Sequence, residues 1–192
     1  MYQVRIHGRG GQGVVTGAEM LSIAAFIEGR HAQAFPSFGS ERMGAPVTAF
    51  CRIDDREIRL REPVLAPDAL IIQDPTLLHQ VDVFHGLSPG GYILINSSRG
   101  FDELGIAEIA RLGQDRRRCT VPATELAMKH VGRPLPNAAL LGGFAAISGQ
   151  VKLESVAAAI RQKFPPAVAA PNIAAAEEAY ALVKRSREAL HA

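Results

Sequence analysis

The chain has 192 residues, of which 47% are hydrophobic and 21% charged, and these figures fit one globular domain while excluding disorder and fibrous repeats. Its formal net charge of +2 is too small for a nucleic-acid-binding protein, which gathers many Lys and Arg on one face. The two cysteines are too few for an iron–sulfur cluster and imply no disulfide framework, which fits a reducing compartment. No signal-peptide pattern and no membrane-spanning apolar stretch is present, so we expect a soluble cytoplasmic protein that binds neither membranes nor nucleic acid.

The chain opens with a strand, a turn and a helix. Residues 4–7 alternate polar and apolar side chains and predict a strand, which meets the glycine-rich sequence GRGGQG of residues 8–13. Residues 14–27 are apolar at helical spacing, and Gly29 stands where a helix C-cap is expected. This order predicts the first half of a βαβ unit.

The next segment lacks a clear period. Residues 30–46 contain two prolines and two glycines, and we expect a long ordered loop over residues 31–46. Residues 47–53 and 57–60 flank a short polar sequence, which predicts an antiparallel hairpin.

The remainder alternates strand and helix patterns. Strands are expected over residues 67–74, 92–96 and 118–121, the first two being continuous apolar runs typical of strands buried on both faces. Helices are expected over residues 75–83, 123–130, 136–148, 153–164 and 172–190. We therefore predict one Rossmann-like α/β domain over residues 1–192, with a mostly parallel sheet, an antiparallel hairpin and helices on both faces.

The glycine turn indicates a phosphate site. Gly8, Gly10 and Gly13 satisfy G-x-G-x-x-G between a strand and a helix, where unpaired N–H groups attract an anion and Thr16 adds a hydroxyl. An NAD site also needs an acidic residue after the second strand, whereas Glu28 stands at the helix end. Another phosphate-bearing ligand such as coenzyme A stays open, as does a turn that only permits tight packing.

Two segments together point to a family. Residues 10–16 (GGQGVVT) and 32–47 (AQAFPSFGSERMGAPV) closely resemble the gamma subunit of thiamine-diphosphate-dependent 2-oxoacid:ferredoxin oxidoreductases. This group includes the pyruvate, ketoisovalerate, indolepyruvate and phenylglyoxylate enzymes. The match continues in order through residues 67–68, 74–78, 96–97, 136–137 and 141–142, so it covers essentially the whole chain.

The resemblance implies an enzyme that converts a 2-oxoacid and coenzyme A into acyl-coenzyme A, carbon dioxide and two electrons. Partner subunits in such enzymes hold thiamine diphosphate with Mg²⁺ and the [4Fe-4S] clusters. Electrons pass to ferredoxin, or to NAD through a further subunit that carries FAD. This chain alone would be inactive, with no catalytic residue and no metal of its own.

The resemblance also assigns residues. The coenzyme A contacts would be Gly8, Gly10, Gly11, Gln12, Gly13, Thr16 and Asn137. The subunit interface at the active-site entrance would include Phe35, Ser37, Phe38, Gly39, Glu41, Arg42 and Gly44.

Simpler roles exist for several of these residues. Glu41 and Arg42 could form a cross-subunit ion pair or a solvated surface pair, and Arg42 could bind a carboxylate or phosphate. Phe35 and Phe38 could face a partner or pack over the first helix. Asn137 fits a helix start whatever the function. Two further hypotheses stay open for the whole chain, namely a stand-alone dinucleotide reductase and a ligand-free structural adaptor.

Overall fold

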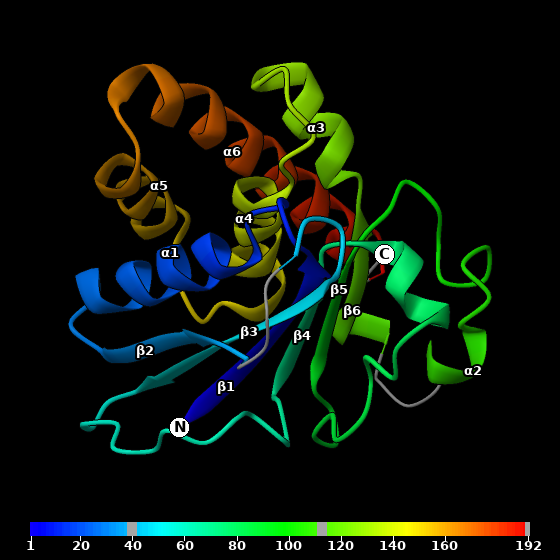
Figure 1. Cartoon of the computed structure of the whole chain (residues 1–192). Coiled ribbons are helices and arrows are strands. Elements are labelled where there is room, and N and C mark those ends of the chain that lie inside the picture. The colour runs from blue at the N-terminus through cyan, green and yellow to red at the C-terminus, as the bar shows by residue number, and fades with distance from the viewer. Residues whose placement is uncertain (38–41, 111–114, 191–192) are drawn as a thin grey trace.

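The protein is an α/β domain built on a twisted sheet (Figure 1). The structure is a computed structural model that describes residues 1–37, 42–110 and 115–190. Within them the strand order is β2-β3-β1-β4-β5-β6. The strands are β1 (Tyr2–Arg9), β2 (His31–Pro36), β3 (Pro46–Asp54), β4 (Ala69–Ile72), β5 (Tyr92–Asn96) and β6 (Arg118–Val121). β1, β4, β5 and β6 are parallel, and β2 and β3 form the antiparallel part, which confirms the predicted fold class.

The helical cover is uneven. The helices are α1 (Val14–Ile27), α2 (Ala107–Ala110), α3 (Ala123–His130), α4 (Asn137–Ser148), α5 (Leu153–Lys163) and α6 (Pro166–Ala189), with 3-10 turns η1 (Pro75–His79) and η2 (Asp115–Arg117). The longer helices lie together on one face of the sheet (Figure 1). Short elements and loops, including η1 and α2, cover β4 and β5 on the other face. No helix in the described residues is long and apolar enough to span a membrane.

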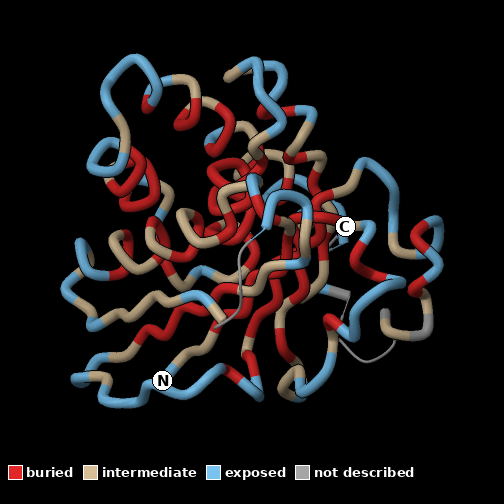
Figure 2. Tube along the Cα trace, in the orientation of Figure 1, coloured by how far each residue is buried: buried red, intermediate tan, exposed pale blue. Residues whose placement is uncertain are grey.

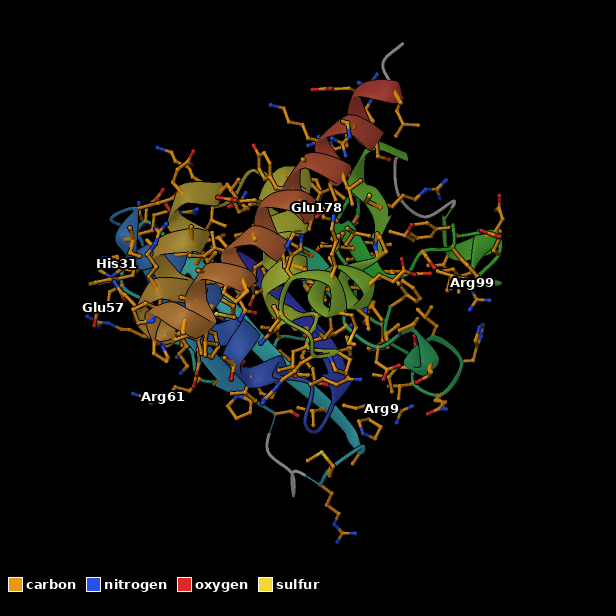
Figure 3. All side chains as sticks on the ribbon, turned by 90° about the horizontal axis from the view of Figure 1, so that it is seen from above. Arg9, His31, Glu57, Arg61, Arg99 and Glu178 are labelled. Carbon is orange, nitrogen blue, oxygen red and sulfur yellow. The ribbon has the colours of Figure 1, made fainter. Side chains whose placement is uncertain are left out.

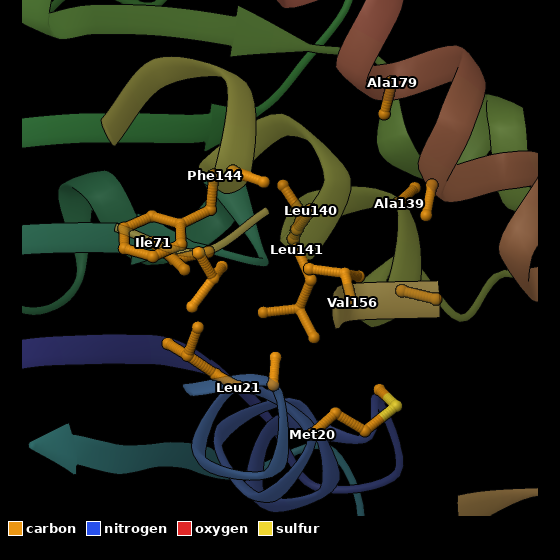
Figure 4. Packing of buried hydrophobic residues seen from close by; sticks show 14 of the residues in the cluster. Met20, Leu21, Ile71, Ala139, Leu140, Leu141, Phe144, Val156 and Ala179 are labelled. Carbon is orange, nitrogen blue, oxygen red and sulfur yellow. The ribbon is translucent and has the colours of Figure 1, made fainter. Parts of the chain in front are cut away.

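The strands β4 and β5 separate two hydrophobic clusters. Ile71 and Leu94 point into the main cluster with α1 and α4, whereas Leu70 and Ile93 point into the smaller one. Figure 4 shows the main cluster around Phe144 of α4. Figure 2 shows that buried residues follow one another along the central strands. The continuous apolar sequences of these strands therefore reflect burial on both faces, as predicted.

The expected loop over residues 31–46 is wrong in its first part, because His31–Pro36 forms strand β2. β2 pairs antiparallel with β3 at the edge of the sheet. Ala32 and Ala34 face the main core, so the strand does alternate. Two small alanines and a terminal proline lack the branched side chains by which strands are usually recognised.

The expected hairpin also has the wrong partner. Residues 47–53 lie in β3, but residues 57–60 form no strand. β3 is an interior strand that pairs with β2 on one side and β1 on the other, with Val4 opposite Cys51. The antiparallel hairpin is thus β2–β3, and its strands are joined by a longer connection than the short polar turn suggested.

Two helix boundaries differ from the sequence expectation. The helix expected over residues 75–83 is the shorter turn η1, Pro75–His79. The last helix begins at Pro166 rather than at residue 172, and Pro171 lies inside it. A proline in the first helical position costs no hydrogen bond, so Pro166 can begin the helix. A proline inside a helix is unusual, and the helix start was therefore predicted from the sequence to lie after Pro171.

Candidate functional site

A cleft of about 640 Å³ lies at the carboxyl ends of β1, β4 and β5. Parallel α/β sheets bind ligands at this edge, and sites for small ligands and cofactors commonly measure about 300–1,000 Å³. These strand ends point upward in Figure 1. The cleft is lined by Gly10, Gly11, Gln12, Met43, Gln73, Asp74, Pro75, Thr76, Asn96, Thr124 and residues 133–136.

The glycine turn places unpaired backbone donors beside this cleft. Gly11 and Gly13 have φ of +90° and +71°, which residues with a Cβ adopt only under strain. Gly13 is the N-cap of α1 and has no side-chain cap. Among the described residues, the N–H groups of Gly11 and of residues 13–16 find no acceptor. Such groups and the helix dipole together favour an anion.

Gly8 and Gly10 serve packing inside the protein. A Cβ on Gly8 would meet Val14 Cγ2 at 2.5 Å, because β1 and α1 approach closely there. A Cβ on Gly10 would meet the carbonyl oxygen of Arg42 at 2.2 Å. The absence of side chains at these two positions is therefore explained without a ligand.

Asp74 closes one wall of the cleft. Its Oδ2 accepts a hydrogen bond from Gln12 Nε2 at 2.7 Å and lies 3.3 Å from Arg9 Nε. Its Oδ1 accepts from the Thr76 backbone N–H at 2.9 Å and from Thr76 Oγ1 at 2.6 Å. Burial alone would raise the pKa of Asp74, but the hydrogen bonds from Thr76 and Gln12 and the charge of Arg9 lower it below its ordinary value. Asp74 therefore stays ionised.

The segment of residues 42–45 is bound directly to the glycine turn. Gly10 N donates to Ala45 O at 2.9 Å, and Gly44 N donates to Gly10 O at 3.0 Å. Arg9 Nη1 adds a bond to Gly44 O at 3.0 Å. Figure 3, seen from above, shows Arg9 at this edge of the molecule, well away from Glu178 on α6. The glycine turn and residues 42–45, which belong to the two segments that carried the family resemblance, thus lie side by side.

A family model described as "Pyruvate ferredoxin/flavodoxin oxidoreductase" matches residues 3–182. The chain belongs to this family. It is 46% identical over 180 residues to the "Pyruvate/ketoisovalerate oxidoreductases common subunit gamma" of Thermococcus kodakarensis, covering 94% of this chain and 96% of that one. It is 50% identical over 161 residues to the "Pyruvate synthase subunit PorC" of Methanosarcina barkeri, covering 84% and 85%.

The solved structures agree with this placement in the pyruvate ferredoxin/flavodoxin oxidoreductase family. The crystal structure of the pyruvate oxidoreductase subunit PORC of Thermotoga maritima matches with a TM-score of 0.81 and 35% identity, covering 94% of this chain and 95% of that one. The resemblance to gamma-type subunits of an oxidoreductase, drawn from the glycine turn and residues 32–47, is thereby confirmed.

In this chain, two further residues that were predicted to contact coenzyme A, Asn137 and Thr16, lie near the glycine turn. Asn137 is buried at the start of α4 and donates from Nδ2 to Gly13 O at 3.2 Å, so it holds the starts of α1 and α4 together. Its Oδ1 accepts from the Ala138 N–H at 2.9 Å. Thr16 lies half-buried in the first turn of α1. Asn137 is thus placed to orient the turn, whereas the donor role expected for Thr16 stays a prediction.

The expected interface residues are only partly brought together. Arg42 and Gly44 are exposed on the segment that contacts the turn. Ser37 extends the β2–β3 ladder, its N–H donating to Thr48 O at 2.8 Å. Phe35 packs against Phe50, with ring centroids 5.1 Å apart. The predicted residues Phe38, Gly39 and Glu41 lie outside the described residues.

Phe35 does not pack over the first helix, which was one of its two expected positions. Its neighbours Ala32 and Ala34 face α1 and the main core, so Phe35 lies on the opposite face of the sheet. The guanidinium of Arg52 lies 5.3 Å from its ring centroid. It is therefore half-buried against β3 rather than packed over the first helix.

Sequence reasoning gave no role to Arg9, Asp74 or Arg133, although all three border the turn or the cleft. Asp74 follows β4, and its partner Gln12 is 62 residues away in the chain. The available signal was topological: β4 pairs in parallel with β1, so its carboxyl end must lie beside the glycine turn. Glu28, which was discounted, accepts a hydrogen bond from Lys152 N at 2.6 Å instead.

Proposed function

We propose that this chain is the gamma subunit of a 2-oxoacid oxidoreductase, and that it receives coenzyme A at the glycine turn. The relatives named above act on pyruvate or ketoisovalerate according to their names, and both compounds are 2-oxoacids. The reaction is the conversion of a 2-oxoacid and coenzyme A into acyl-coenzyme A and carbon dioxide, with two electrons passing to ferredoxin or to another acceptor. A stand-alone dinucleotide reductase is disfavoured, because the carboxylate of Asp74, which an NAD ribose would need, is already engaged by Gln12, Thr76 and Arg9.

The unpaired N–H groups of the turn carry the proposal. Coenzyme A has a pyrophosphate, and a helix N-terminus with a glycine turn matches that chemistry. Gly11, which lines the cleft and has no side chain, would let a phosphate approach the backbone of the turn, whereas the space beside Gly13 is taken by the side chain of Asn137. α4 also begins beside the turn, so the starts of two helices lie together there.

The charges around the cleft are compatible with the binding of an anion. Asp74 is negative, but Arg9 is ion-paired with it at 3.3 Å. Arg133, which also lines the cleft, is exposed, and its side chain forms no hydrogen bond or ion pair within the described residues. An anion entering between the walls would therefore meet one uncompensated positive charge and the dipole of α1.

Electron transfer and thiamine chemistry belong to partner subunits in this proposal. Cys51 is fully buried, and burial raises the pKa of its thiol to about 12, so it stays protonated and is a poor iron ligand. No group of three or more His, Cys, Asp or Glu in the described residues could hold a metal ion. The two cysteines of the chain are too few for a [4Fe-4S] cluster. In this proposal partner subunits hold the clusters, thiamine diphosphate with Mg²⁺ and any FAD.

A charge swap at Gly11 tests the proposal. Gly11 is exposed, and a Cβ there would meet only the flexible end of Met43, with Sδ at 2.3 Å. Asp and Asn tolerate positive φ better than other residues and have nearly the same shape. Gly11→Asp and Gly11→Asn therefore impose the same strain and differ by one negative charge beside the proposed phosphate.

In the assembled enzyme, Gly11→Asp should raise the KM for coenzyme A about tenfold above that of Gly11→Asn, since a charge about 5 Å away acts with about 1–3 kcal/mol. The difference in KM between the two variants should become smaller at high salt, because salt screens the added charge. Electron release from the 2-oxoacid to a dye before coenzyme A is added should be equal in the two variants. Equal KM values for coenzyme A would refute the ligand site and leave a docking subunit only.

A further inference from the structure

The Asp74 carboxylate is engaged mainly by other groups of the protein. Of the about four hydrogen bonds that a carboxylate can accept, Asp74 accepts one from Gln12 and two from Thr76, and its Oδ2 also forms an ion pair with Arg9 Nε at 3.3 Å. Its side chain is 12% exposed and lies on the cleft wall. An ionised group held in this way orients its neighbours rather than the substrate.

Gln12 is held from all sides by groups of the protein. Its Oε1 accepts from Arg9 N at 2.8 Å, and its Nε2 donates to Asp74. Its backbone N donates to Arg9 O at 3.1 Å, and its backbone O accepts from Gln73 Nε2. The side chain keeps at most one N–H for a ligand. Gln12 therefore fixes the course of the turn from inside, whereas the sequence had predicted a phosphate contact.

Arg9 extends this network beyond the turn. Its Nη2 donates to Thr76 Oγ1 at 2.8 Å and to Gln80 Oε1 at 2.7 Å, and its Nη1 reaches Gly44 O. The ion pair with Asp74 fixes the guanidinium between three chain segments. The turn, η1 and residues 42–45 are thus held together through one carboxylate.

We propose that Asp74 is a positioning residue for coenzyme A, acting through Gln12 and Arg9 to hold the backbone N–H groups of Gly11 and of residues 13–16 in a binding-ready arrangement. This inference rests on the proposed function. Without Asp74 the turn would have to be ordered by the ligand itself, and that cost would appear as weaker binding. The reaction at saturating coenzyme A would be unaffected, because Asp74 does not touch the reacting atoms.

The direction of the effect separates positioning from simple charge. If Asp74 acted only as a negative charge near a phosphate, its neutralisation would tighten coenzyme A binding. If it positions the turn, Asp74→Asn loses the Arg9 ion pair and places an amide N–H against the donors of Gln12 or Thr76. The second case predicts weaker binding, so the two hypotheses predict opposite signs.

The experiment is a kinetic comparison in the assembled enzyme. Asp74→Asn should raise the KM for coenzyme A about tenfold while kcat and the KM for the 2-oxoacid stay within about twofold. Thr76→Val removes one donor to Asp74 and the acceptor of two hydrogen bonds from Arg9, but leaves the bond between Asp74 and Gln12. It should raise the KM for coenzyme A about two- to threefold, and it serves if Asp74→Asn fails to assemble. An unchanged or lower KM for coenzyme A in either variant overturns the proposal.

Two controls identify which idea has failed. In Gln12→Met the Asp74→Asn exchange should raise the KM for coenzyme A by a smaller factor than in the native enzyme, because only the path through Arg9 is left to lose. The same factor in both backgrounds would contradict action through Gln12. A normal Asp74→Asn enzyme together with a responsive Gly11 pair refutes positioning alone, whereas failure of both refutes the coenzyme A site itself.

Discussion

His7 makes the stability of the domain depend on pH. It lies on β1 directly before the glycine turn and is 6% exposed. Its Nε2 accepts from Arg5 Nε at 3.0 Å, and its Nδ1 lies 3.5 Å from Thr48 Oγ1. Burial, and then the charge of Arg5, lower the pKa of His7 from 6.5 to about 4. The imidazole is therefore neutral in the folded protein at neutral pH.

Acid should weaken the fold through this residue. Below pH 6.5 the unfolded chain binds a proton at His7, and the folded chain does so only near pH 4, so the loss begins below 6.5 and is complete below about 4. The pKa difference of about 2.5 corresponds to about 3.4 kcal/mol in total, of which about 2 kcal/mol is lost at pH 5.

Urea unfolding of the purified chain at pH 7.5 and pH 5 measures this loss. The control is His7→Gln, whose Oε1 can accept from Arg5 but which does not titrate. The native chain should lose about 2 kcal/mol more than His7→Gln between the two pH values, while the other histidines contribute equally to both. Equal losses in the two proteins would refute the assignment of the acid sensitivity to His7.

Two further predictions concern docking and packing. Arg42 is exposed and its side chain bonds to no described residue, so Arg42→Ala should leave the Tm of the free chain unchanged. The same substitution should weaken association with the partner subunits about fivefold in a binding titration. Unchanged association would refute the interface role of Arg42. Gly142→Ala should cost about 2 kcal/mol or more in thermal unfolding, since its Cβ would meet Ala176 O at 2.0 Å. Gly143→Ala, which meets only side chains at 3.3 Å or more, should stay within about 1 kcal/mol, and equal losses would contradict this reasoning.

Apolar periodicity and continuous apolar runs predicted most of the helices and strands, because these patterns depend only on neighbouring residues. The helix over residues 14–27 and the strand over residues 92–96 match the structure because an apolar period or a continuous apolar run fixes each one. β2 could not be found in this way. Its partner strand β3 follows a connection that no short turn motif indicates, and its residues Ala32 and Ala34 are too small for a strand signal.

The glycine motif predicted where the site lies but not what each of its residues does. G-x-G-x-x-G identified the turn, yet the spacing cannot tell that Gly8 and Gly10 serve close packing while Gly11 and Gly13 adopt positive φ. That difference depends on the carbonyl of Arg42 and on α1, which only the folded chain brings near. Asp74 was missed for the same reason, because its relation to the turn arises from the pairing of β1 and β4.

The hydrogen bonds between Gly10 and residues 44–45 have a consequence for both proposed roles. A ligand that orders the turn also orders the segment that carries Arg42, and a partner that holds this segment also orders the turn. Linkage requires the two effects to be equal in free energy, so coenzyme A should tighten subunit association by the factor by which association tightens coenzyme A. Arg9, which bonds to Gly44 and pairs with Asp74, is the side chain through which both would act.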